Sequence, residues 1–591
     1  MTTAIRVLCF MILLSASSFR AAAEDFTNAI HAYLQQRVEL EKRDVGIVVG
    51  IVDEHGSSIV SCGKLDNGTD QAVNGSTVFE IGSVTKTFTA LLLQDMIERG
   101  EMKLDDPVAR YLPKSVRMPT RNGKEITLLQ LATHTSGLPD NPDNVDTKSA
   151  DSPYADYSVE KLYAFLSGYR LTRDPGAKYQ YSNLGMGLLG HVIALKAGTN
   201  YESLVVDRIC RPLKMDSTRI TLTPGMKARF AQGHSELNYA VPVMEFGVLA
   251  GCGALCSTAH DQLKYVSANL GLTPSTLTPL MEKTQVAHFR LEPDTDIGLA
   301  WYISDLHGTQ IIWKTGGTGG FRTFIGFDKA RRRGVVVLAN TEDWDVVYGL
   351  GLLLLESEWQ SDHRPKETKI SNKVYGSYLG QYQRPPDVAL VSSNMIPSGI
   401  GICREGDRLF AQATGSRSWP VDVLLPPLTI ELLPESENRF FERLSGIPMT
   451  FSRDTRGKVT GLTVHFQGRE FYYEKISDQP PKAPEPLKRP VAIKLAPKLL
   501  DACVGHYEVA PDAAYPTGIK LTIWRQGDQL FGQAWGENVL EGAFDMYPES
   551  ETNFFCKINH MRYTFIKNGQ GEVTAVVRSI TGLNHEGKKL K

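Results

Sequence analysis

The pattern of hydrophobic and polar residues changes along the chain, and its first half predicts a domain that mixes strands and helices. A nearly continuous apolar run at 45–52 ends at a turn, and the chain returns through 58–61, which predicts a β-hairpin. Apolar residues then recur at helical spacing from residue 83 onward. A second stretch rich in β-branched residues covers 311–340. Residues 24–358 are therefore expected to form an α+β or α/β domain.

The second half of the chain alternates apolar and polar residues over short runs that end at turn signals. Two changes in composition divide it: a polar linker at 359–372, and a proline-rich linker at 478–497 that predicts a stiff, extended spacer. The linkers bound two segments, 373–477 and 498–591. Short alternating strands of this kind are typical of small antiparallel sheets that close on themselves.

The two segments also resemble each other, which indicates an internal repeat. Four blocks recur in the same order in both. The paired blocks are YLGQYQ and CVGHYE at 378–383 and 503–508, REGDRLFAQA and RQGDQLFGQA at 404–413 and 525–534, PESENRFF and PESETNFF at 434–441 and 548–555, and TFSRDTRGKVTGL and TFIKNGQGEVTAV at 450–462 and 564–576. Each segment is predicted to be a small antiparallel β-barrel of about eight strands, a structural or lid-forming appendage.

Length and composition set limits on this picture. A chain of 591 residues is too long for one hydrophobic core, so several domains are expected. An apolar content of 42% and a formal net charge of −2, from 64 basic and 66 acidic residues, exclude disorder of the whole chain. The same balance gives no basic excess, so no nucleic-acid partner is expected. Eight cysteines in a chain of this length do not make a disulfide-stapled scaffold.

Residues 1–23 have the pattern of a secretory signal peptide. Arg6 gives a charged start, 7–14 form a short apolar stretch, and three alanines at 21–23 precede Glu24 as a cleavage site. The apolar stretch is about half of the ~20 residues needed to span a bilayer, so no stable membrane anchor is expected. The alternative is a buried N-terminal helix. The signal pattern predicts a protein that is periplasmic or secreted, in a bacterium.

Ser83 and Lys86 form an S-x-x-K motif at the start of the predicted helix, in the sequence FEIGSVTKTFTALLL. On a helix, residues three apart share a face, so the two side chains would lie one above the other. A serine hydroxyl is a poor nucleophile until a neighbouring group takes its proton, and a lysine amine with a lowered pKa can take it. The motif also occurs by chance, but its place before a strongly apolar helix favours a nucleophilic site.

Tyr181 and Asn183 belong to a second candidate motif, YSN, between DPGAKYQ and LGMGLLG. A tyrosine with a lowered pKa can move a proton between a serine and a leaving group. An asparagine two residues later offers an amide that orients a substrate. The alternative is that the tripeptide is only a turn that leads into a glycine-rich apolar helix.

The third candidate motif, KTGGTGGF, begins at Lys314 and has β-rich sequence on both sides. Lys314 and Thr315 on a strand would offer a cation and a hydroxyl to a substrate carboxylate, and Gly316 would permit close approach of the backbone. The backbone N–H groups of Gly317 and Ser83 would together form an oxyanion hole. A phosphate-binding loop is excluded, because the spacing is not G-x-x-x-x-G-K-[ST] and a strand follows.

Together, and in this order, the three motifs carry a resemblance to a known family. The chain resembles the penicillin-recognising serine hydrolases, most closely the branch of class C β-lactamases, DD-peptidases and family VIII esterases. The likeness covers about residues 40–345 and includes supporting stretches at 100–113, 126–139, 251–265 and 334–340. It implies a five-stranded antiparallel sheet flanked by helices, with the site between the sheet and an all-helical lobe. The two C-terminal segments are similar to the lipocalin-like barrels of the D-aminopeptidase branch.

The resemblance also implies a role for each matched residue. Ser83 would be the acylated nucleophile, and Lys86 and Tyr181 would be the proton-transfer pair. The implied substrate-binding residues are Asn183, Lys314, Thr315 and Gly316, and the implied oxyanion donors are the N–H groups of Ser83 and Gly317.

Departures from the family pattern bear on the choice of substrate. Class C β-lactamases commonly place a glutamine after SGLP, where this chain has Asp140-Asn141, and often have a histidine where Trp313 stands. The D-aminopeptidase branch usually has a histidine in place of Lys314. A retained lysine favours substrates that bear a carboxylate, such as penicillins, cephalosporins or peptides ending in D-alanine.

We therefore expect an exported serine acyl-hydrolase that acts through an acyl-enzyme on Ser83 and hydrolyses β-lactams or D-amino-acid-containing peptides. The alternatives are a family VIII-type carboxylesterase and a non-turnover penicillin-binding or sensing protein. The expected partner is a small-molecule or peptide substrate, with no cofactor and no metal, and the oligomeric state is left open. The resemblance implies that His134 and His260 are structural, because the family's mechanism uses no histidine at these places. Cys252 and Cys256 are predicted to be packing residues, because no second Cys/His pair stands at metal spacing.

Overall fold

The computed structural model describes most of the chain. The described residues are 26–145, 154–306, 308–356, 366–385, 397–414, 417–418, 422–423, 429–466, 469–482, 486–512, 518–536, 539–540, 543–557, 561–580 and 583–590. The predicted signal at 1–23 and parts of both predicted linkers lie outside them. The chain divides into two compact units: one consists mainly of residues 352–486, and the other mainly of residues 43–351 and 487–591.

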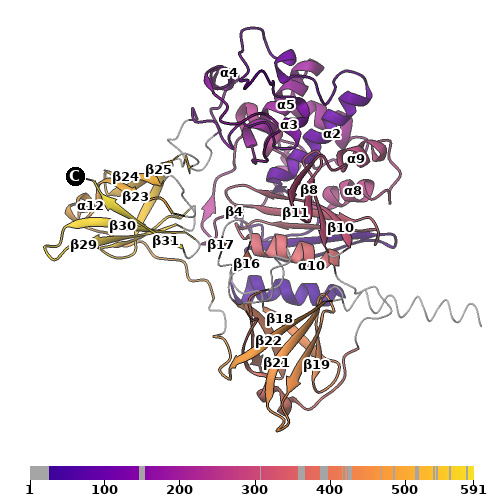
Figure 1. Ribbon diagram of the computed structural model, residues 1–591, viewed down its shortest axis with the longest axis vertical. Coiled ribbons are helices and arrows are strands. Elements are labelled where there is room, and N and C mark those ends of the chain that lie inside the picture. The colour runs from indigo at the N-terminus through magenta and orange to yellow at the C-terminus, as the bar shows by residue number, and fades with distance from the viewer. Residues whose placement is uncertain are drawn as a thin grey trace, which may run out of the picture. The chain divides into compact units, whose positions relative to one another are not determined.

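A sheet of eight strands forms the centre of the larger unit, in the order β2-β1-β12-β11-β10-β9-β8-β7. Their bounds in that order are Gly56–Gly63, Gly46–Asp53, Arg333–Ala339, Arg322–Asp328, Thr309–Gly317, Tyr302–Leu306, Thr295–Ile297 and Phe289–Glu292. Figure 1 labels the strands β8, β10 and β11 of this sheet. The five strands that the resemblance implied are too few. Short antiparallel hairpins after residue 289 continue the hydrogen-bond ladder beyond β10.

Helices cover both faces of this sheet, which explains its continuous apolar strands. Figure 1 shows α8 (Ala259–Asn269) and α10 (Leu350–Glu356) on opposite faces. Helix α8 packs against β1, β11 and β12, and Gly351 of α10 lies against the Phe324 ring of β11. All seven residues of β11 and of β12 are buried, as expected for strands covered on two sides. The β-hairpin predicted from residues 45–61 is confirmed by β1 and β2.

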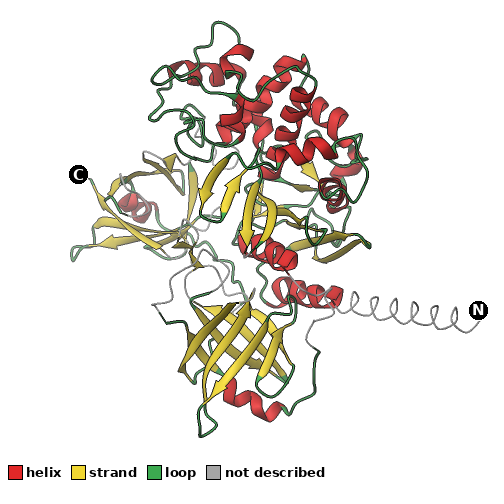
Figure 2. Cartoon of the chain, turned by 45° about the vertical axis from the view of Figure 1, so that its right-hand side comes forward, coloured by secondary structure: helices red, strands yellow, loops and turns green. Residues whose placement is uncertain are grey.

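An all-helical lobe stands beside the sheet (Figure 2). Its helices and those nearby are α2 (Thr85–Glu98), α3 (Leu128–Ala132), α4 (Val159–Gly168), α5 (Asn183–Ala197), α6 (Tyr201–Val205), α7 (Pro224–Lys227) and α9 (Thr278–Thr284). Every residue of α2 from Thr85 to Met96 is buried, so this helix is the core of the lobe rather than an amphipathic cover. Two-stranded ladders complete the domain: β3 (Phe79–Glu80) with β6 (Cys256–Ser257), and β4 (Gly233–His234) with β5 (Ala240–Val241).

Both C-terminal segments form closed eight-stranded antiparallel barrels, which confirms that prediction. The first barrel consists of β13 (Gly380–Gln383), β14 (Gly399–Glu405), β15 (Arg408–Thr414), β18 (Thr429–Pro434), β19 (Arg439–Glu442), β20 (Pro448–Arg453), β21 (Val459–Phe466) and β22 (Arg469–Ser477). A short pair, β16 (Arg417–Ser418) and β17 (Asp422–Val423), is separate from it. Helix α11 (Tyr375–Tyr378) precedes the barrel.

The second barrel consists of β23 (Gly505–Val509), β24 (Ile519–Gln526), β25 (Gln529–Gly536), β27 (Phe544–Pro548), β28 (Asn553–Phe555), β29 (Arg562–Lys567), β30 (Val573–Ile580) and β31 (Leu583–Lys589), with β26 (Val539–Leu540) paired to β25. Pairing of β24 with β25 closes it, and α12 (Pro497–Cys503) precedes it. The barrels share a local contact: the Tyr382 hydroxyl donates to the Tyr378 carbonyl at 2.6 Å, and the Tyr507 hydroxyl donates to the Cys503 carbonyl at 2.7 Å.

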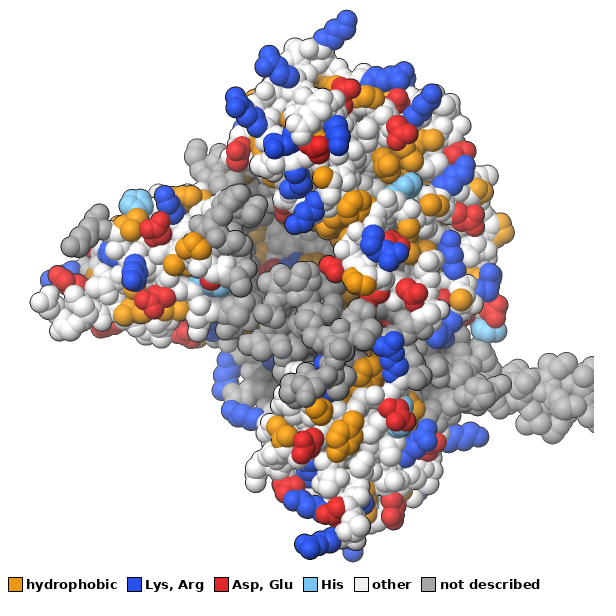
Figure 3. Space-filling view, viewed as in Figure 1, with side chains coloured by type: hydrophobic (Ala, Val, Ile, Leu, Met, Phe, Trp, Pro, Cys, Tyr) orange, Lys and Arg blue, Asp and Glu red, His pale blue; other side chains and the backbone are white. Residues whose placement is uncertain are grey.

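Charged side chains of both signs are interspersed on the face shown in Figure 3. In the described part of the chain, no helix combines the length and the apolar character that crossing a bilayer requires. The seven described cysteines form no disulfide with one another, and six of them are buried.

Candidate active site

Ser83 lies in a 3₁₀ turn, η2 (Gly82–Val84), immediately before helix α2. Glycine is required at position 82, because its φ of +48° is in the left-handed region and a Cβ there would lie 2.6 Å from the Gly317 nitrogen. The turn therefore fits tightly against strand β10. Ser83 itself is half-buried, so a substrate can reach its hydroxyl.

Lys86, in the first turn of α2, donates hydrogen bonds to three oxygen atoms. Its Nζ lies 2.8 Å from Ser83 Oγ, 2.7 Å from Asn183 Oδ1 and 2.7 Å from the Cys252 carbonyl oxygen. An amide oxygen and a backbone carbonyl can only accept hydrogens. When Lys86 is a neutral amine, it has two N–H groups and one lone pair. The two N–H groups are donated to the Asn183 and Cys252 oxygens, and the lone pair then faces the Ser83 hydroxyl. The fully buried Lys86 side chain is thus presented to the serine as a proton acceptor.

Burial acts in opposite directions on the two groups that contact Ser83 Oγ. It lowers the pKa of Lys86 to about 8, an effect that Cys252 and the Asp140 carboxylate partly offset. The Tyr181 hydroxyl donates to Ser83 Oγ at 2.7 Å, and burial raises its pKa well above the usual value. Tyr181 therefore stays a neutral phenol, and it lacks the lowered pKa that a proton-accepting tyrosine needs. Lys86 is the group that can accept the serine proton near neutral pH.

Asn183 is the first residue of α5, and Asp140 fixes the orientation of its amide. Ser182 caps the helix by accepting the Gly185 N–H. Asp140 Oδ1 accepts the backbone N–H of Asn183 at 3.1 Å and its Nδ2–H at 3.0 Å. Because only the NH₂ end of an amide can donate to a carboxylate, the Asn183 Oδ1 faces Lys86. The YSN tripeptide is thus both a turn into a helix and part of the site.

The third partner of Lys86 is a backbone atom, the carbonyl of Cys252 in η5 (Gly247–Cys252). This 3₁₀ segment packs directly on α5, because a Cβ at Gly190 would lie only 2.9 Å from the Cα of Gly251. The glycines of the LGMGLLG stretch marked this close approach in the sequence. Nothing in the sequence indicated that the Cys252 carbonyl would be the one to contact Lys86.

His134 supports Tyr181 and does not contact the nucleophile. Its ring lies against the Tyr181 ring with centroids 4.4 Å apart, and its Nδ1 accepts the backbone N–H of Ser182 at 3.1 Å. Burial, followed by the positive charges of Lys314 and Lys86, holds the pKa of His134 well below its usual value. A neutral, buried histidine of this kind has the structural role that we expected for it.

Lys314, on β10, is the second buried lysine of the site. Its side chain is 1% exposed, and its Nζ has no hydrogen-bond partner among the described residues. The Nζ instead lies 4.3 Å from the centroid of the Tyr302 ring and 5.1 Å from that of Tyr181. Burial and the charge of Lys86 lower the pKa of Lys314 well below its usual value. Aromatic faces only partly offset the cost of burying an ammonium, so the group is suited to receive an anion.

Strand β10 packs against the chain just before Ser83, and this contact requires glycine at position 316. A Cβ there would lie 2.0 Å from the carbonyl oxygen of Ile81. The Thr323 hydroxyl lies 3.0 Å from that oxygen and 3.3 Å from the Gly316 carbonyl, which joins the two segments further. Thr315 is half-buried on the same strand. The packing brings the Gly317 backbone beside the Ser83 turn, where the two predicted oxyanion donors would act.

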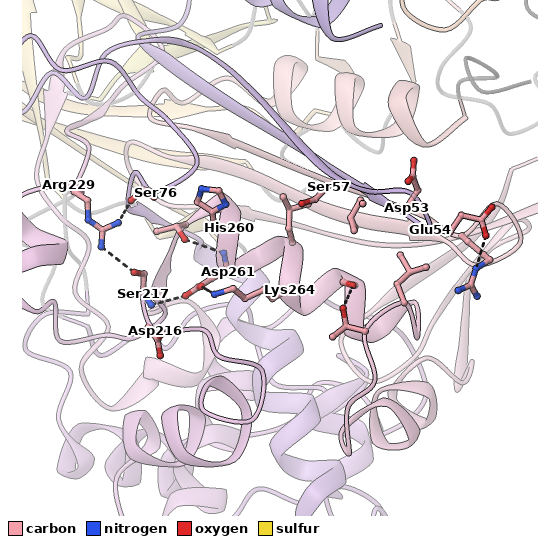
Figure 4. Close-up of a pocket in the computed structure, with 18 residues that line it drawn as sticks. Asp53, Glu54, Ser57, Ser76, Asp216, Ser217, Arg229, His260, Asp261 and Lys264 are labelled. Atoms are coloured by element: carbon pink, nitrogen blue, oxygen red, sulfur yellow. Dashed lines mark hydrogen bonds and ion pairs between the residues drawn. The ribbon is translucent and has the colours of Figure 1, made fainter. Parts of the chain in front are cut away.

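A pocket of about 750 Å³ elsewhere on the same domain contains none of the predicted site residues (Figure 4). Two ion pairs join charged side chains that line it. Asp261 accepts the Ser217 N–H at 2.7 Å and lies 2.9 Å from Lys264, and Glu54 lies 3.7 Å from Arg332. In the part of the chain that the structure describes, no three metal-ligating side chains gather as a candidate metal site.

The structure therefore brings Ser83, Lys86, Tyr181 and Asn183 into one hydrogen-bonded cluster. It places the Lys314 Nζ 5.1 Å from the centroid of the Tyr181 ring and Thr315, Gly316 and Gly317 along the same strand as Lys314. A serine that faces a buried lysine, with a second buried lysine near the same tyrosine, defines a serine hydrolase of the Ser-Lys type. The family model described as Beta-lactamase matches residues 30–355, more than half of the chain, so the chain belongs to the beta-lactamase family.

Several known proteins are similar to this chain. A beta-lactamase of Escherichia coli (strain K12) is 29% identical over 368 residues, which cover 56% of this chain and 93% of the relative. The D-alanyl-D-alanine-carboxypeptidase/endopeptidase AmpH of the same strain is 28% identical over 352 residues, which cover 56% of this chain and 89% of the relative. A crystal structure of a class C beta lactamase from Rhodobacter sphaeroides is 27% identical and has a TM-score of 0.47, and the match covers 53% of this chain and 94% of that one.

Proposed function

We propose that this protein is an exported serine acyl-hydrolase that cleaves β-lactams or D-amino-acid-containing peptides through an acyl-enzyme on Ser83. The observation that carries the substrate class is Lys314, a buried ammonium without a hydrogen-bond partner among the described residues, beside the ring of Tyr181. A substrate carboxylate would accept a hydrogen bond from the Lys314 Nζ. Little further desolvation free energy would be needed on the protein side, because the lysine is already buried. Both β-lactams and D-alanyl peptides carry such a carboxylate next to the bond that is cleaved.

In the proposed reaction, Lys86 takes the Ser83 proton as Oγ attacks the substrate carbonyl carbon. The electron pair of the carbonyl moves to its oxygen, which accepts hydrogen bonds from the N–H groups of Ser83 and Gly317. As the tetrahedral intermediate collapses, the C–N bond breaks and the nitrogen takes a proton delivered through Tyr181, which is already a hydrogen-bond donor in the site. Water then attacks the ester on Ser83, and its proton returns through the same groups.

Two further functions remain as alternatives within this chemistry. A carboxylesterase would use the same nucleophile on substrates that have no carboxylate for Lys314. A non-turnover penicillin-binding or sensing protein would form the acyl-enzyme and keep it. Support for the lead proposal comes from the retained lysine and from the similarity to one relative named beta-lactamase and another named D-alanyl-D-alanine-carboxypeptidase/endopeptidase.

One panel of substrates tests the proposal: a chromogenic cephalosporin, a peptide ending in D-alanyl-D-alanine and a short-chain nitrophenyl ester. We expect turnover of at least one of the first two and an acyl adduct on Ser83 by mass spectrometry. Ser83→Ala should abolish both signals. Turnover of the ester alone would favour the carboxylesterase, and an adduct without turnover would favour the binding protein. Full activity of Ser83→Ala would overturn the assignment of the nucleophile.

Export is a separate part of the proposal and rests on the pattern of residues 1–23. The expected location is the bacterial periplasm or the medium. Fractionation of cells that express the full chain, with N-terminal sequencing of the product, should give a protein that starts at Glu24. A cytoplasmic product that keeps Met1 would contradict export and leave the catalytic proposal intact.

A further inference from the structure

One carboxylate borders the site without taking part in the proton transfer described above. Asp140 follows the buried loop that carries His134, and its side chain is exposed. It is joined to the nucleophile through a short chain of hydrogen bonds: Ser83 Oγ to Lys86 Nζ, Lys86 Nζ to Asn183 Oδ1, and Asn183 Nδ2 to Asp140 Oδ1. Asp140 thus lies at the solvent side of the Asn183 amide, while Lys86 lies at its buried side.

The donors around Asp140 do not fully compensate its charge. Its Oδ1 accepts two hydrogen bonds from Asn183, and its Oδ2 accepts one, at 3.2 Å, from the Asn141 side chain. All three donors are neutral. Among the described residues no cation forms an ion pair with it, and its side chain is open to a ligand from solvent. A carboxylate in this state gains from a charged donor on a bound substrate.

The position of Asp140 relative to Ser83 determines which part of a bound substrate the Asp140 carboxylate can contact. The carboxylate on the leaving-group side of the substrate belongs to Lys314 on β10, whereas Asp140 is hydrogen-bonded to Asn183 at the start of α5. If the carboxylate is held at the strand, the acyl group is left to the helical side of the site, where Asn183 and Asp140 lie. A substituent close to the scissile carbonyl would pass the Asn183 amide and reach the exposed Asp140 carboxylate.

We propose that Asp140 is a specificity-determining residue that binds an ammonium group on the acyl portion of the substrate. The site would then prefer substrates with a cationic amine near the bond that is cleaved over equivalents in which that amine is absent or acylated. This inference rests on the proposed function, because it assigns the acyl side of the same site. It adds a cation-binding subsite on the helical side of the site, whereas the anion-binding Lys314 lies on the strand.

The test compares two substrates that differ only in the amine. Benzylpenicillin and ampicillin share a ring system and a phenylacetyl group, and ampicillin alone carries an α-amino group. For the purified full chain, kcat/KM and the rate of Ser83 acylation by mass spectrometry are measured with each penicillin. D-Alanine p-nitroanilide and its N-acetyl form give a second pair. Asp140→Asn and Asp140→Gln keep an acceptor for Asn183 but remove the charge.

We expect the preference for the amine-bearing member to fall about tenfold in both variants, as for loss of one charged hydrogen bond. Asp143→Asn, which removes an exposed charge three residues away, should leave the preference unchanged. Equal losses for both members of a pair, with the preference retained, would show that Asp140 only positions Asn183 and would overturn the inference. Failure of all four substrates to acylate Ser83 would overturn the proposed function itself, and this inference with it.

Discussion

Two buried lysines lie near the Tyr181 ring, one on a helix and one on a strand, and their surroundings differ. On the helical side, Lys86 lies 4.8 Å from the ring centroid and has three oxygen partners, from α5, η5 and the Ser83 turn. On the sheet side, Lys314 lies 5.1 Å from the same centroid and has no hydrogen-bond partner among the described residues. Both side chains are almost completely enclosed.

The different hydrogen bonding of Lys86 and Lys314 suits the two lysines to different tasks, proton transfer and anion recognition. A lysine whose acceptors are all supplied by the protein has a fixed direction, which suits transfer of a proton to and from one neighbour. A lysine whose acceptors are missing keeps its electrostatic attraction for a ligand, which suits recognition of an anion. Burying the cationic form of Lys314 without a partner destabilises the folded protein. Binding of an anion offsets this desolvation free energy.

The sharpest way to break this comparison is to remove Lys86. Lys86→Met should lower the rate of Ser83 acylation by roughly 10²- to 10⁴-fold for every substrate, with or without a carboxylate, because the proton acceptor is lost. Rapid mixing with mass spectrometry of the Ser83 adduct measures this rate. Lys227→Met, at an exposed position on α7, is the control and should acylate normally. An acylation rate that is lowered only for carboxylate substrates would contradict the role of Lys86.

Removal of Lys314 should have a smaller and selective effect. Lys314→Met should lower kcat/KM roughly 10- to 150-fold for a cephalosporin or a D-alanyl peptide, which lose one charged hydrogen bond, and should change little for a neutral nitrophenyl ester. The same variant should melt at a higher temperature, because a buried polar group without a hydrogen-bond partner among the described residues is replaced by an apolar side chain. A lower melting temperature with equal loss for all substrates would show that Lys314 is structural.

The contact that joins the two sides can be tested at its glycines. Gly316→Ala should destabilise the protein by about 1–3 kcal/mol and weaken acylation, because a Cβ at 316 meets the Ile81 oxygen at 2.0 Å. Gly319→Ala, in the turn just after β10, is the control, because the nearest atom to a new Cβ there is 4.0 Å away. Thermal melts and acylation rates of the two variants should therefore diverge, and identical behaviour would exclude the close packing described here.

The dependence on pH sharpens the comparison without any substitution. Lys86 accepts a proton only as the neutral amine, and its pKa is about 8, so acylation by a neutral ester should rise about tenfold per unit below that pH and level off above it. Carboxylate substrates need the cationic form of Lys314, whose pKa is lowered, so for them the rate should fall again at higher pH. In Lys314→Met that falling limb should disappear. Identical pH profiles for both kinds of substrate would contradict separate roles.

The sequence motifs predicted which side chains come together in the site, but not the hydrogen-bond partners of each side chain. Ser83 and Lys86 are three residues apart, so their contact follows from helix geometry. The hydrogen bonds of Asp140 to Asn183 join residues 43 apart, and only the folded chain brings them together. No residue type encodes the Cys252 carbonyl as a partner of Lys86, and no motif encodes the absence of a partner for Lys314.

The fold shows the same limit. Apolar runs and helical spacing were enough to predict β1 and the helix after Ser83, because nearly complete burial leaves a continuous hydrophobic signature. The more exposed β2 was predictable as the return strand of the hairpin that the turn after β1 begins. Strands β7 and β8 are only four and three residues long and contain one buried residue between them, so their addition to the expected five strands had no comparable signal. The barrels were predictable because both copies carry regular turn signals between short strands.

The enclosed Lys314 ammonium has a consequence for how the protein behaves in ordinary buffers. Sulfate, phosphate and acetate each carry the oxygen anion that this position lacks, so they compete with the carboxylate of a substrate. The apparent KM for a cephalosporin should therefore rise with the concentration of such a salt, whereas the KM for a neutral ester should not. Affinities for carboxylate substrates should therefore be lower in phosphate than in a buffer with a bulky anion. The measured preference for carboxylate substrates over neutral esters will then depend on the buffer.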